Sequence, residues 1–306
     1  MQLATSLGLF AGAALLVGSE VKALRSLGEP KRLMAFSALA QIGYVLIGLS
    51  LGSFNGLTGA FLHIGYQALI RALWYMSLKR LAGGAGGWNL EALRGAGQGR
   101  EALSVMMGFA MFCALGISPV TAPAGKPLVL FAAVDGGHVL TALAMAFSSA
   151  IAAVYTVRLF QAVCLEKAGP RAEGASKAGT SPADLVCWAL MAASVLACLF
   201  PHGLIHMAAS SAAGILGLAD IPAVADLEGS WPLQVLVPYL GGFAVYAVGR
   251  FLPAWRSAVV LAVAAASVAA AWFTPDLAPL QNMFTTLYAL VGGVIVVYSL
   301  GYVGEK

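Results

Sequence analysis

The stretch GLTGAFLHIGYQALIRALWYMSL, residues 56–78, is apolar enough to cross a membrane but carries a histidine, a glutamine and an arginine. A spanning helix needs about 20 mostly apolar residues, and this stretch meets that requirement despite its polar side chains. His63, Gln67 and Arg71 follow one another at intervals of four residues. Residues with that spacing lie on one side of a helix, so we expect a polar stripe that rises roughly 12 Å along the helix axis.

The rest of the chain is as apolar as this stretch. The chain has 306 residues, of which 60% are hydrophobic and 10% charged, whereas soluble domains carry about 25% charged residues. We therefore predict an all-α, polytopic membrane protein with about nine transmembrane helices. Eight of the expected spans are continuous apolar segments: 2–18, 33–51, 58–78, 138–160, 184–201, 233–251, 257–273 and 283–303.

The ninth expected span, residues 102–135, is interrupted. Its two apolar runs are separated by SPVTAPAGKP, residues 118–127. Proline removes a helical hydrogen bond and clashes with the preceding turn. We expect one discontinuous spanning helix with Lys126 in its unwound middle.

The placement of basic residues supports a single crossing of 102–135. Cytoplasmic loops of membrane proteins are enriched in lysine and arginine. With one crossing, all but two of the 17 basic residues fall in loops or at helix ends on one side of the membrane. Two crossings would reverse every later loop and remove this bias. We therefore expect a protein of the cytoplasmic (inner) membrane, with its N-terminus outside and its C-terminus in the cytoplasm.

The two remaining basic residues, Arg71 and Lys126, fall within predicted spans. A charge at the centre of a bilayer costs at least ~3 kcal/mol, so such residues normally face the protein interior or a wet cavity. Histidine titrates near neutral pH, and burial disfavours the charged form of lysine. These properties favour a proton path lined by His63, Gln67, Arg71 and Lys126. Alternatively, His63 and Gln67 only hydrogen-bond neighbouring helices, and Arg71 pairs with a carboxylate of another subunit.

Polar residues outside this stripe give weaker indications of function. Asp135 and His138 in VDGGHV are predicted to form a turn at the outer surface, with a possible role at the exit of the proton path. His202 and His206 have a metal-like spacing but no nearby third ligand, so we predict no metal site. The sequence also predicts no bound cofactor and no nucleic-acid partner.

Four segments of the chain resemble one family. EPKRLMAFSALAQIGYVLIGL (29–49) resembles the DLKRLLAYSSISQIGY stretch of antiporter-like subunits of respiratory complex I. HIGYQALIRALWYMSL is similar to the HxxxHAxxKALLFL helix of these subunits, and residues 113–133 to their discontinuous LAGIPPLAGFFSKxxLF helix. SSAIAAVYTVRLF (148–160) resembles the helix that follows. The family also includes multisubunit cation/proton antiporters and the membrane arms of energy-converting hydrogenases, among them formate hydrogenlyase.

The resemblance covers roughly residues 1–165 and assigns roles to particular side chains. It implies that His63 is the first histidine of the central helix and that Lys126 is the lysine that ends the proton path. Gln67 stands where the family has a second histidine, and Arg71 where it has a lysine. Arginine stays protonated in proteins, so Arg71 is expected to act as a fixed charge. The family's first inverted repeat is not found upstream of Met1, so we expect a partner to supply the missing half of the path, or a reduced subunit that scaffolds a complex.

These observations predict three regions: an antiporter-like transmembrane domain at 1–165, a cytoplasmic linker at 166–183 and C-terminal transmembrane helices at 184–306. The function expected from the resemblance is a proton (or Na⁺) half-channel in a membrane subunit of a complex I-like or hydrogenase-type assembly. Such a subunit is itself non-catalytic, and its partners are the bilayer and the other membrane and peripheral subunits of a redox-driven complex. Two alternatives remain: a non-conducting subunit that scaffolds such a complex, and the membrane component of a two-component bicarbonate or cation uptake system.

Overall fold

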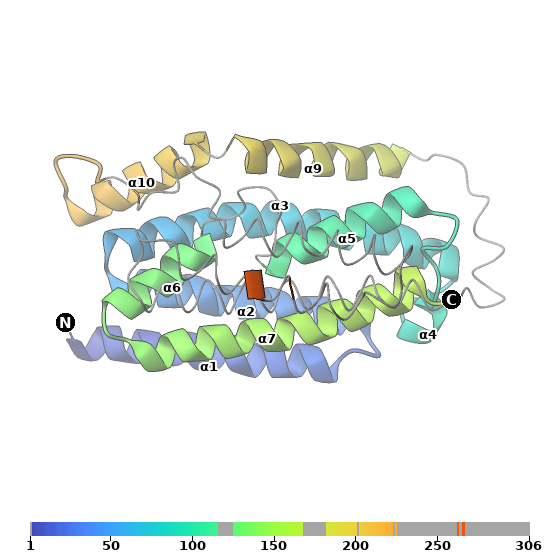
Figure 1. The fold of residues 1–306 in the computed structure, drawn as a ribbon, viewed down its shortest axis with the longest axis horizontal. Coiled ribbons are helices and arrows are strands. Elements are labelled where there is room, and N and C mark those ends of the chain that lie inside the picture. Colours follow the sequence, from blue (N-terminus) through green and yellow to red (C-terminus); the bar gives the residue numbers. More distant parts are fainter. Residues whose placement is uncertain are drawn as a thin grey trace. The chain divides into compact units, whose positions relative to one another are not determined.

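The computed structural model describes residues 2–115, 125–167, 182–200, 202–222, 224, 262 and 265–266. Every regular element in this part of the chain is a helix. The chain divides into two compact units, Met1–Ala225 and Asp226–Lys306, and the helices labelled in Figure 1 belong to the first. The predicted spans 233–251 and 283–303, most of the linker, and all of the span 257–273 except residues 262 and 265–266 lie outside the described residues.

The chain begins with a hairpin of two long helices, α1 (Gln2–Arg25) and α2 (Pro30–Leu51). Their backbones touch, because a Cβ atom on Gly43 would lie 2.8 Å from the carbonyl oxygen of Gly12. α1 continues seven residues beyond the predicted end of its span at residue 18 and therefore includes Glu20. α2 ends at Gly52, whose φ of 61° requires a left-handed backbone conformation that glycine adopts without strain.

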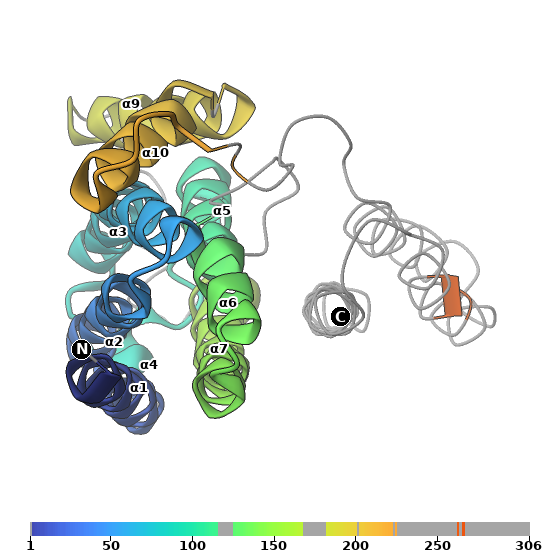
Figure 2. The same cartoon turned by 90° about the vertical axis from the view of Figure 1, so that its left-hand side faces the viewer.

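The central element is α3 (Phe54–Ala85), a helix of 32 residues. Ser53 caps its first turn by accepting a hydrogen bond from the backbone N–H of Gly56. α3 packs against α2 and against four later helices, α5 (Glu101–Leu115), α6 (Gly125–Asp135), α9 (Pro182–Leu199) and α10 (His202–Leu216). Seen along the helix axes, α1, α2 and α3 form one row, and α7, α6 and α5 form a second row beside it (Figure 2).

The predicted discontinuous helix corresponds to α5 and α6, and residues 116–124 between them lie outside the described part. α6 crosses α3 at two glycines: a Cβ atom on Gly125 would lie 2.7 Å from the backbone nitrogen of His63, and one on Gly59 would lie 2.9 Å from the carbonyl oxygen of Gly125. Lys126 is the second residue of α6. The prediction that it lies in an unwound stretch was therefore wrong, because the helix begins before it.

α7 (Val139–Phe160) follows a tight turn in which Gly137 has a φ of 74°. It continues into a π-helix, η1 (Gln161–Leu165). Two carbonyl oxygens of η1 accept hydrogen bonds from the backbone N–H groups of Gly95 and Gly97, at 2.9 Å each. The connection 83–101, whose many glycines are typical of a flexible loop, is thus held against η1, and it contains a short helix, α4 (Leu90–Leu93).

Three described helices are long and apolar enough to cross a membrane: Leu3–Arg25, Pro30–Leu51 and Val139–Leu165. α9 and α10 form a pair bent by 70°, which counts as a further broken span or a re-entrant loop. α3 is longer than any of the three, but its polar residues lower its hydropathy. The described part therefore confirms an all-α membrane protein.

Candidate functional site

The polar stripe of α3 points into the bundle, as the four-residue spacing predicted. His63 and Gln67 are buried, and Arg71 is partly buried. His63 Nε2 lies 3.1 Å from Gln41 Oε1 of α2. Arg71 donates one hydrogen bond to Gln67 Oε1 and another to Ser37 Oγ of α2, both at 3.1 Å. The stripe is therefore joined to α2 at both of its ends, His63 and Arg71.

Lys126 approaches the same stripe from α6. Its side chain is 4% exposed, and its ammonium donates to the carbonyl oxygen of Ala114 at 2.8 Å. Gln67 makes a longer contact, 3.5 Å, with that same carbonyl oxygen. Ala114 lies in the last turn of α5, where carbonyls lack a helical partner and the helix dipole favours a cation. The end of α5 thus connects Lys126 to the stripe.

Tyr44 of α2 completes this side of the site. The Lys126 ammonium lies 5.1 Å from the centre of the Tyr44 ring, within the range of a cation–π interaction. The rings of Tyr44 and His63 are 5.4 Å apart. The Tyr44 hydroxyl also lies 2.8 Å from Ser149 Oγ of α7. Tyr44 therefore bridges Lys126, His63 and α7.

An acidic residue that the sequence did not predict lies on the other side of the site. Glu20 of α1 is 1% exposed, and Gln41 Nε2 makes a long contact, 3.5 Å, with its Oε1. Tyr155 of α7 lies beside the Glu20 carboxyl, and its hydroxyl is 2.6 Å from Ser37 Oγ. Arg71 and Lys126 both interact electrostatically with Glu20. Side chains from α1, α2, α3, α6 and α7 thus form one buried polar network.

The sequence does contain a signal for the α2 part of this network. Ser37, Gln41 and Tyr44 follow one another at intervals of four and three residues, which places them on one face of a helix. All three are buried. They form a second polar stripe that faces the stripe of α3.

Two buried atoms of the network lack a protein partner. Neither Glu20 Oε2 nor His63 Nδ1 has a hydrogen-bond partner among the described residues. Buried polar atoms in proteins are nearly always satisfied by protein or by ordered water. A carboxylate oxygen can accept hydrogen bonds from water, and an imidazole nitrogen can donate or accept one.

Asp135 and His138 lie apart from this network. They flank the turn between α6 and α7, with Asp135 exposed and His138 partly buried. Asp135 is at the opposite end of α6 from Lys126, about 14 Å along the helix axis. The turn is confirmed, and a role in proton exit stays a prediction. In the described ranges, no group of three His, Cys, Asp or Glu residues could hold a metal ion.

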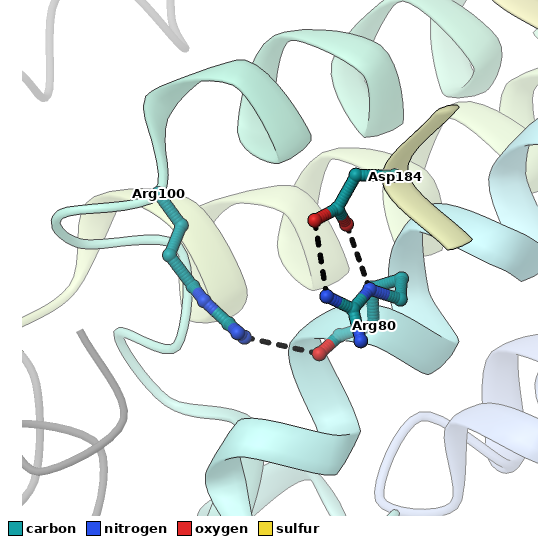
Figure 3. A network of polar contacts seen from close by, with 3 residues as sticks. All are labelled: Arg80, Arg100 and Asp184. Atoms are coloured by element: carbon teal, nitrogen blue, oxygen red, sulfur yellow. Dashed lines mark hydrogen bonds and ion pairs between the residues drawn. The ribbon is translucent and has the colours of Figure 1, made fainter. Parts of the chain in front are cut away.

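Several of the described basic residues, among them Arg80, Arg94, Arg100 and Arg158, lie at one end of the first unit. The C-terminal end of α3, α4, the start of α5 and the end of α7 lie together there (Figure 1). Arg80 of α3 donates two hydrogen bonds to Asp184 of α9, at 2.7 and 3.1 Å, and Arg100 donates to the carbonyl oxygen of Arg80 (Figure 3). A second ion pair, Arg94–Glu166 at 2.6 Å, joins α4 to the end of η1.

Arg80 is expected to hold α9 on α3. Its side chain is 24% exposed and that of Asp184 15%, whereas Arg94 is 52% exposed. We expect Arg80→Ala to lower the free energy of unfolding by about 1.5–3 kcal/mol, because two hydrogen bonds between charged groups are lost. Arg94→Ala should cost at most about 1 kcal/mol. Thermal unfolding of the purified chain in mild detergent measures both. Equal losses in the two variants would show that the Arg80–Asp184 pair does not hold α9.

Comparison with known proteins identifies the family to which the first half of the chain is similar. Residues 3–152 match the family described as "NADH:quinone oxidoreductase/Mrp antiporter, TM". This segment belongs to that family. The matched segment contains the polar stripes of α2 and α3, and also Glu20 and Lys126. The match confirms the family resemblance seen in the sequence.

Relatives within this antiporter-like family are longer than the chain. Over 146 residues, the chain is 28% identical to NADH-quinone oxidoreductase subunit N of Geotalea uraniireducens, an alignment that covers 48% of the chain and 31% of the relative. Two of the solved structures that are similar to the chain show its fold. One is the Mrp complex from Dietzia sp. DQ12-45-1b (TM-score 0.62, 18% identity, 69% of this chain and 47% of that chain). The other is an archaeal membrane-bound sulfane sulfur reductase (TM-score 0.62, 22% identity, 69% and 42%).

Proposed function

We propose that the chain is a membrane subunit of a multisubunit, redox-driven complex and that its buried network carries protons (or Na⁺) across part of the membrane. The observation that carries this proposal is the network itself, which joins ionisable side chains of five helices inside an apolar bundle. Buried polar networks cost stability unless all their members are satisfied. Two atoms of this network, Glu20 Oε2 and His63 Nδ1, have no hydrogen-bond partner among the described residues, and bound water in the path would satisfy them.

The residues of the network differ in what they can do with a proton. Lys126 and His63 can each gain and lose one near neutral pH when their surroundings favour it. Gln67 and Gln41 donate and accept hydrogen bonds without titrating. Arg71 stays protonated, so it orders its neighbours and supplies a constant field. Lys126 is therefore the residue we assign as the titrating station of the path.

The proposed direction of the path follows the distribution of charge. The basic end of the first unit faces the cytoplasm in this proposal, as enrichment in lysine and arginine favours. The N-terminus and the α6–α7 turn with Asp135 and His138 then lie on the outer side, where these two residues would receive a proton that leaves Lys126. The path proposed within this chain is a half-channel, and the redox cofactors belong to partner subunits.

Lys126→Gln in the assembled complex tests the proposal. Glutamine keeps a hydrogen-bond donor for the Ala114 carbonyl oxygen but cannot hold a proton. After purification in mild detergent and reconstitution into liposomes, we expect the ions moved per redox turnover to fall by at least about half, with redox turnover retained. Because other subunits contribute paths of their own, the ratio need not fall to zero.

The control for this test is Lys79→Gln, the same change at an exposed lysine of α3, which should leave the ratio unchanged. Repeating the measurement with and without Na⁺ identifies the ion. An unchanged ratio in Lys126→Gln, with normal assembly, would exclude transport through this network.

A non-conducting scaffold is the second candidate, and one observation favours it. The guanidinium of Arg71 donates hydrogen bonds to both Gln67 and Ser37, an arrangement that also suits a rigid brace between α2 and α3. In that case, substitutions in the network should reduce the yield of the complex and leave the transport ratio of the assembled fraction intact. The third candidate, a two-component bicarbonate or cation uptake system, requires a different co-purifying partner, so the proteins recovered with the chain distinguish it.

A further inference from the structure

Glu20 has no role in the transport path described so far. Within the described residues it is the only fully buried acidic side chain. It lies on the face of α1 that carries Leu16 and Ala23, both also fully buried, so it points toward α2 and α7 rather than toward lipid. An acidic side chain is expensive at this depth and needs a compensating interaction.

Both sides of the carboxyl group meet the network. Gln41 lies between Glu20 and His63 and contacts each through its amide group. Tyr155 lies beside the carboxyl, and its hydroxyl shares Ser37 Oγ with the Arg71 guanidinium. Glu20 is thus linked to His63 through one side chain, Gln41, and to Arg71 through two, Tyr155 and Ser37.

The charges of the network can be counted. Arg71 is +1 at all relevant pH values, and ionised Glu20 is −1. With both present, the cluster is neutral when Lys126 is an amine and +1 when Lys126 is an ammonium. Without the negative charge, these totals become +1 and +2. The cost of charge in a low-dielectric interior rises steeply with net charge. Protonation of Lys126 is therefore strongly disfavoured when Glu20 carries no negative charge and the cluster would reach +2.

We propose that Glu20 is the counter-charge of this network: it offsets the fixed charge of Arg71 and so sets the pH at which Lys126 gains and loses its proton. In one such step, an N–H bond of the Lys126 ammonium breaks, its electron pair stays on Nζ, and the proton passes to a water molecule of the path. In its ionised form Glu20 acts as a positioning residue through its charge. The importance of Glu20 for transport rests on the function proposed above. The effect of its charge on the titration of Lys126 does not depend on that function.

Other groups around the network do not supply this negative charge. The titratable or charged side chains that face Lys126 and Glu20 from the surrounding helices are Tyr44 on α2, His63 and Arg71 on α3, and Tyr155 on α7. Tyrosine ionises only near pH ~10, and histidine and arginine carry positive charge or none. Among the residues that the structure describes, only Glu20 can balance Arg71 with a negative charge.

The titration of Lys126 tests this proposal directly. The full chain is labelled with ¹³C,¹⁵N-lysine, placed in lipid nanodiscs and followed by NMR as a function of pH; the Lys126 signal is the one that Lys126→Gln removes. We expect Glu20→Gln to lower the midpoint of the Lys126 titration by about one pH unit or more, because an attractive charge is lost. Glu20→Asp keeps the charge and should stay near the wild-type midpoint.

A charge cycle completes the test. Arg71→Gln removes the repelling charge and should raise the midpoint, and Glu20→Gln combined with Arg71→Gln should return it toward the wild-type value. A wild-type midpoint in Glu20→Gln overturns the proposal. Should Glu20→Gln not fold, a wild-type midpoint in Arg71→Gln overturns it as well. No transport is measured here, so a negative result for Lys126→Gln in liposomes would remove the transport function and leave the charge coupling standing.

Discussion

Replacing Gly59 with leucine is expected to remove most of the folded chain. A Cβ atom at this position would lie 2.9 Å from the carbonyl oxygen of Gly125 and 2.9 Å from the side chains of Leu128 and Val129. The first of these neighbours is backbone and cannot rotate away, so α6 would have to move off α3. Overpacking a core costs about 1–3 kcal/mol when side chains can adjust. Here we expect at least about 3 kcal/mol, roughly a hundredfold in the folding equilibrium.

Gly65 provides the matched control on the same helix. It lies six residues after Gly59 and is exposed, and a Cβ atom at this position would have no neighbouring atom within 4 Å. Both variants exchange glycine for leucine within α3, so they share the same change in helix propensity. We expect Gly65→Leu to accumulate and unfold like the wild type, as measured by the monodisperse fraction and by thermal unfolding in detergent. Equal loss in both variants would mean that α6 is not seated on α3 at Gly59.

The contact between α6 and α3 also explains which part of the site could be predicted from the sequence. His63, Gln67 and Arg71 lie on one regular helix, so their spacing alone predicts a common face. The same reasoning, applied to charge placement, leaves Lys126 within the membrane. That Lys126 reaches the stripe, however, depends on Gly125 meeting the backbone of α3 at His63. This contact joins residues more than 60 positions apart, which no local pattern reports.

Glu20 was missed for a different reason. The apolar run of the first span ends near residue 18, and Glu20 is followed closely by Lys22 and Arg25, which together are typical of a helix end in the cytoplasm. In the structure α1 continues to Arg25. Lys22 and Arg25 are at least partly exposed, whereas Glu20 is buried. The buried face of α1, with Gly12, Leu16 and Ala23, contains the signal that distinguishes the acid from its basic neighbours.

The connection 83–101 shows the limit of composition as a guide. Its glycines favour a flexible loop, but two of them donate backbone hydrogen bonds to η1. A Cβ atom on Gly97 would lie 3.0 Å from the Cα atom of Cys164. At this position glycine permits close packing of the loop, and the partner that requires it lies over 60 residues later.

Glu20→Lys is expected to have the second large effect on folding. It replaces the negative charge of the network with a positive one, next to Arg71 and Lys126, so that three cations share one buried site. Leaving a buried charge without its partner costs about 3–5 kcal/mol, and reversal of the charge adds repulsion to that loss. We expect the amount of folded chain recovered from membranes to fall by more than about tenfold, since each 1.4 kcal/mol is a factor of ten.

The same substitution at Glu29 separates burial from charge. Glu29 is 61% exposed and pairs with Arg32 on the surface, at 3.1 Å, so Glu29→Lys should cost no more than about 1 kcal/mol. Both changes add the same charge to the same end of the chain. Combining Glu20→Lys with Arg71→Glu restores the charge balance of the network and should recover part of the lost protein, because the two charges have only exchanged places. If Glu20→Lys accumulates as well as Glu29→Lys does, the Glu20 side chain faces water rather than the network, and the charge balance of Arg71 and Lys126 has to come from elsewhere.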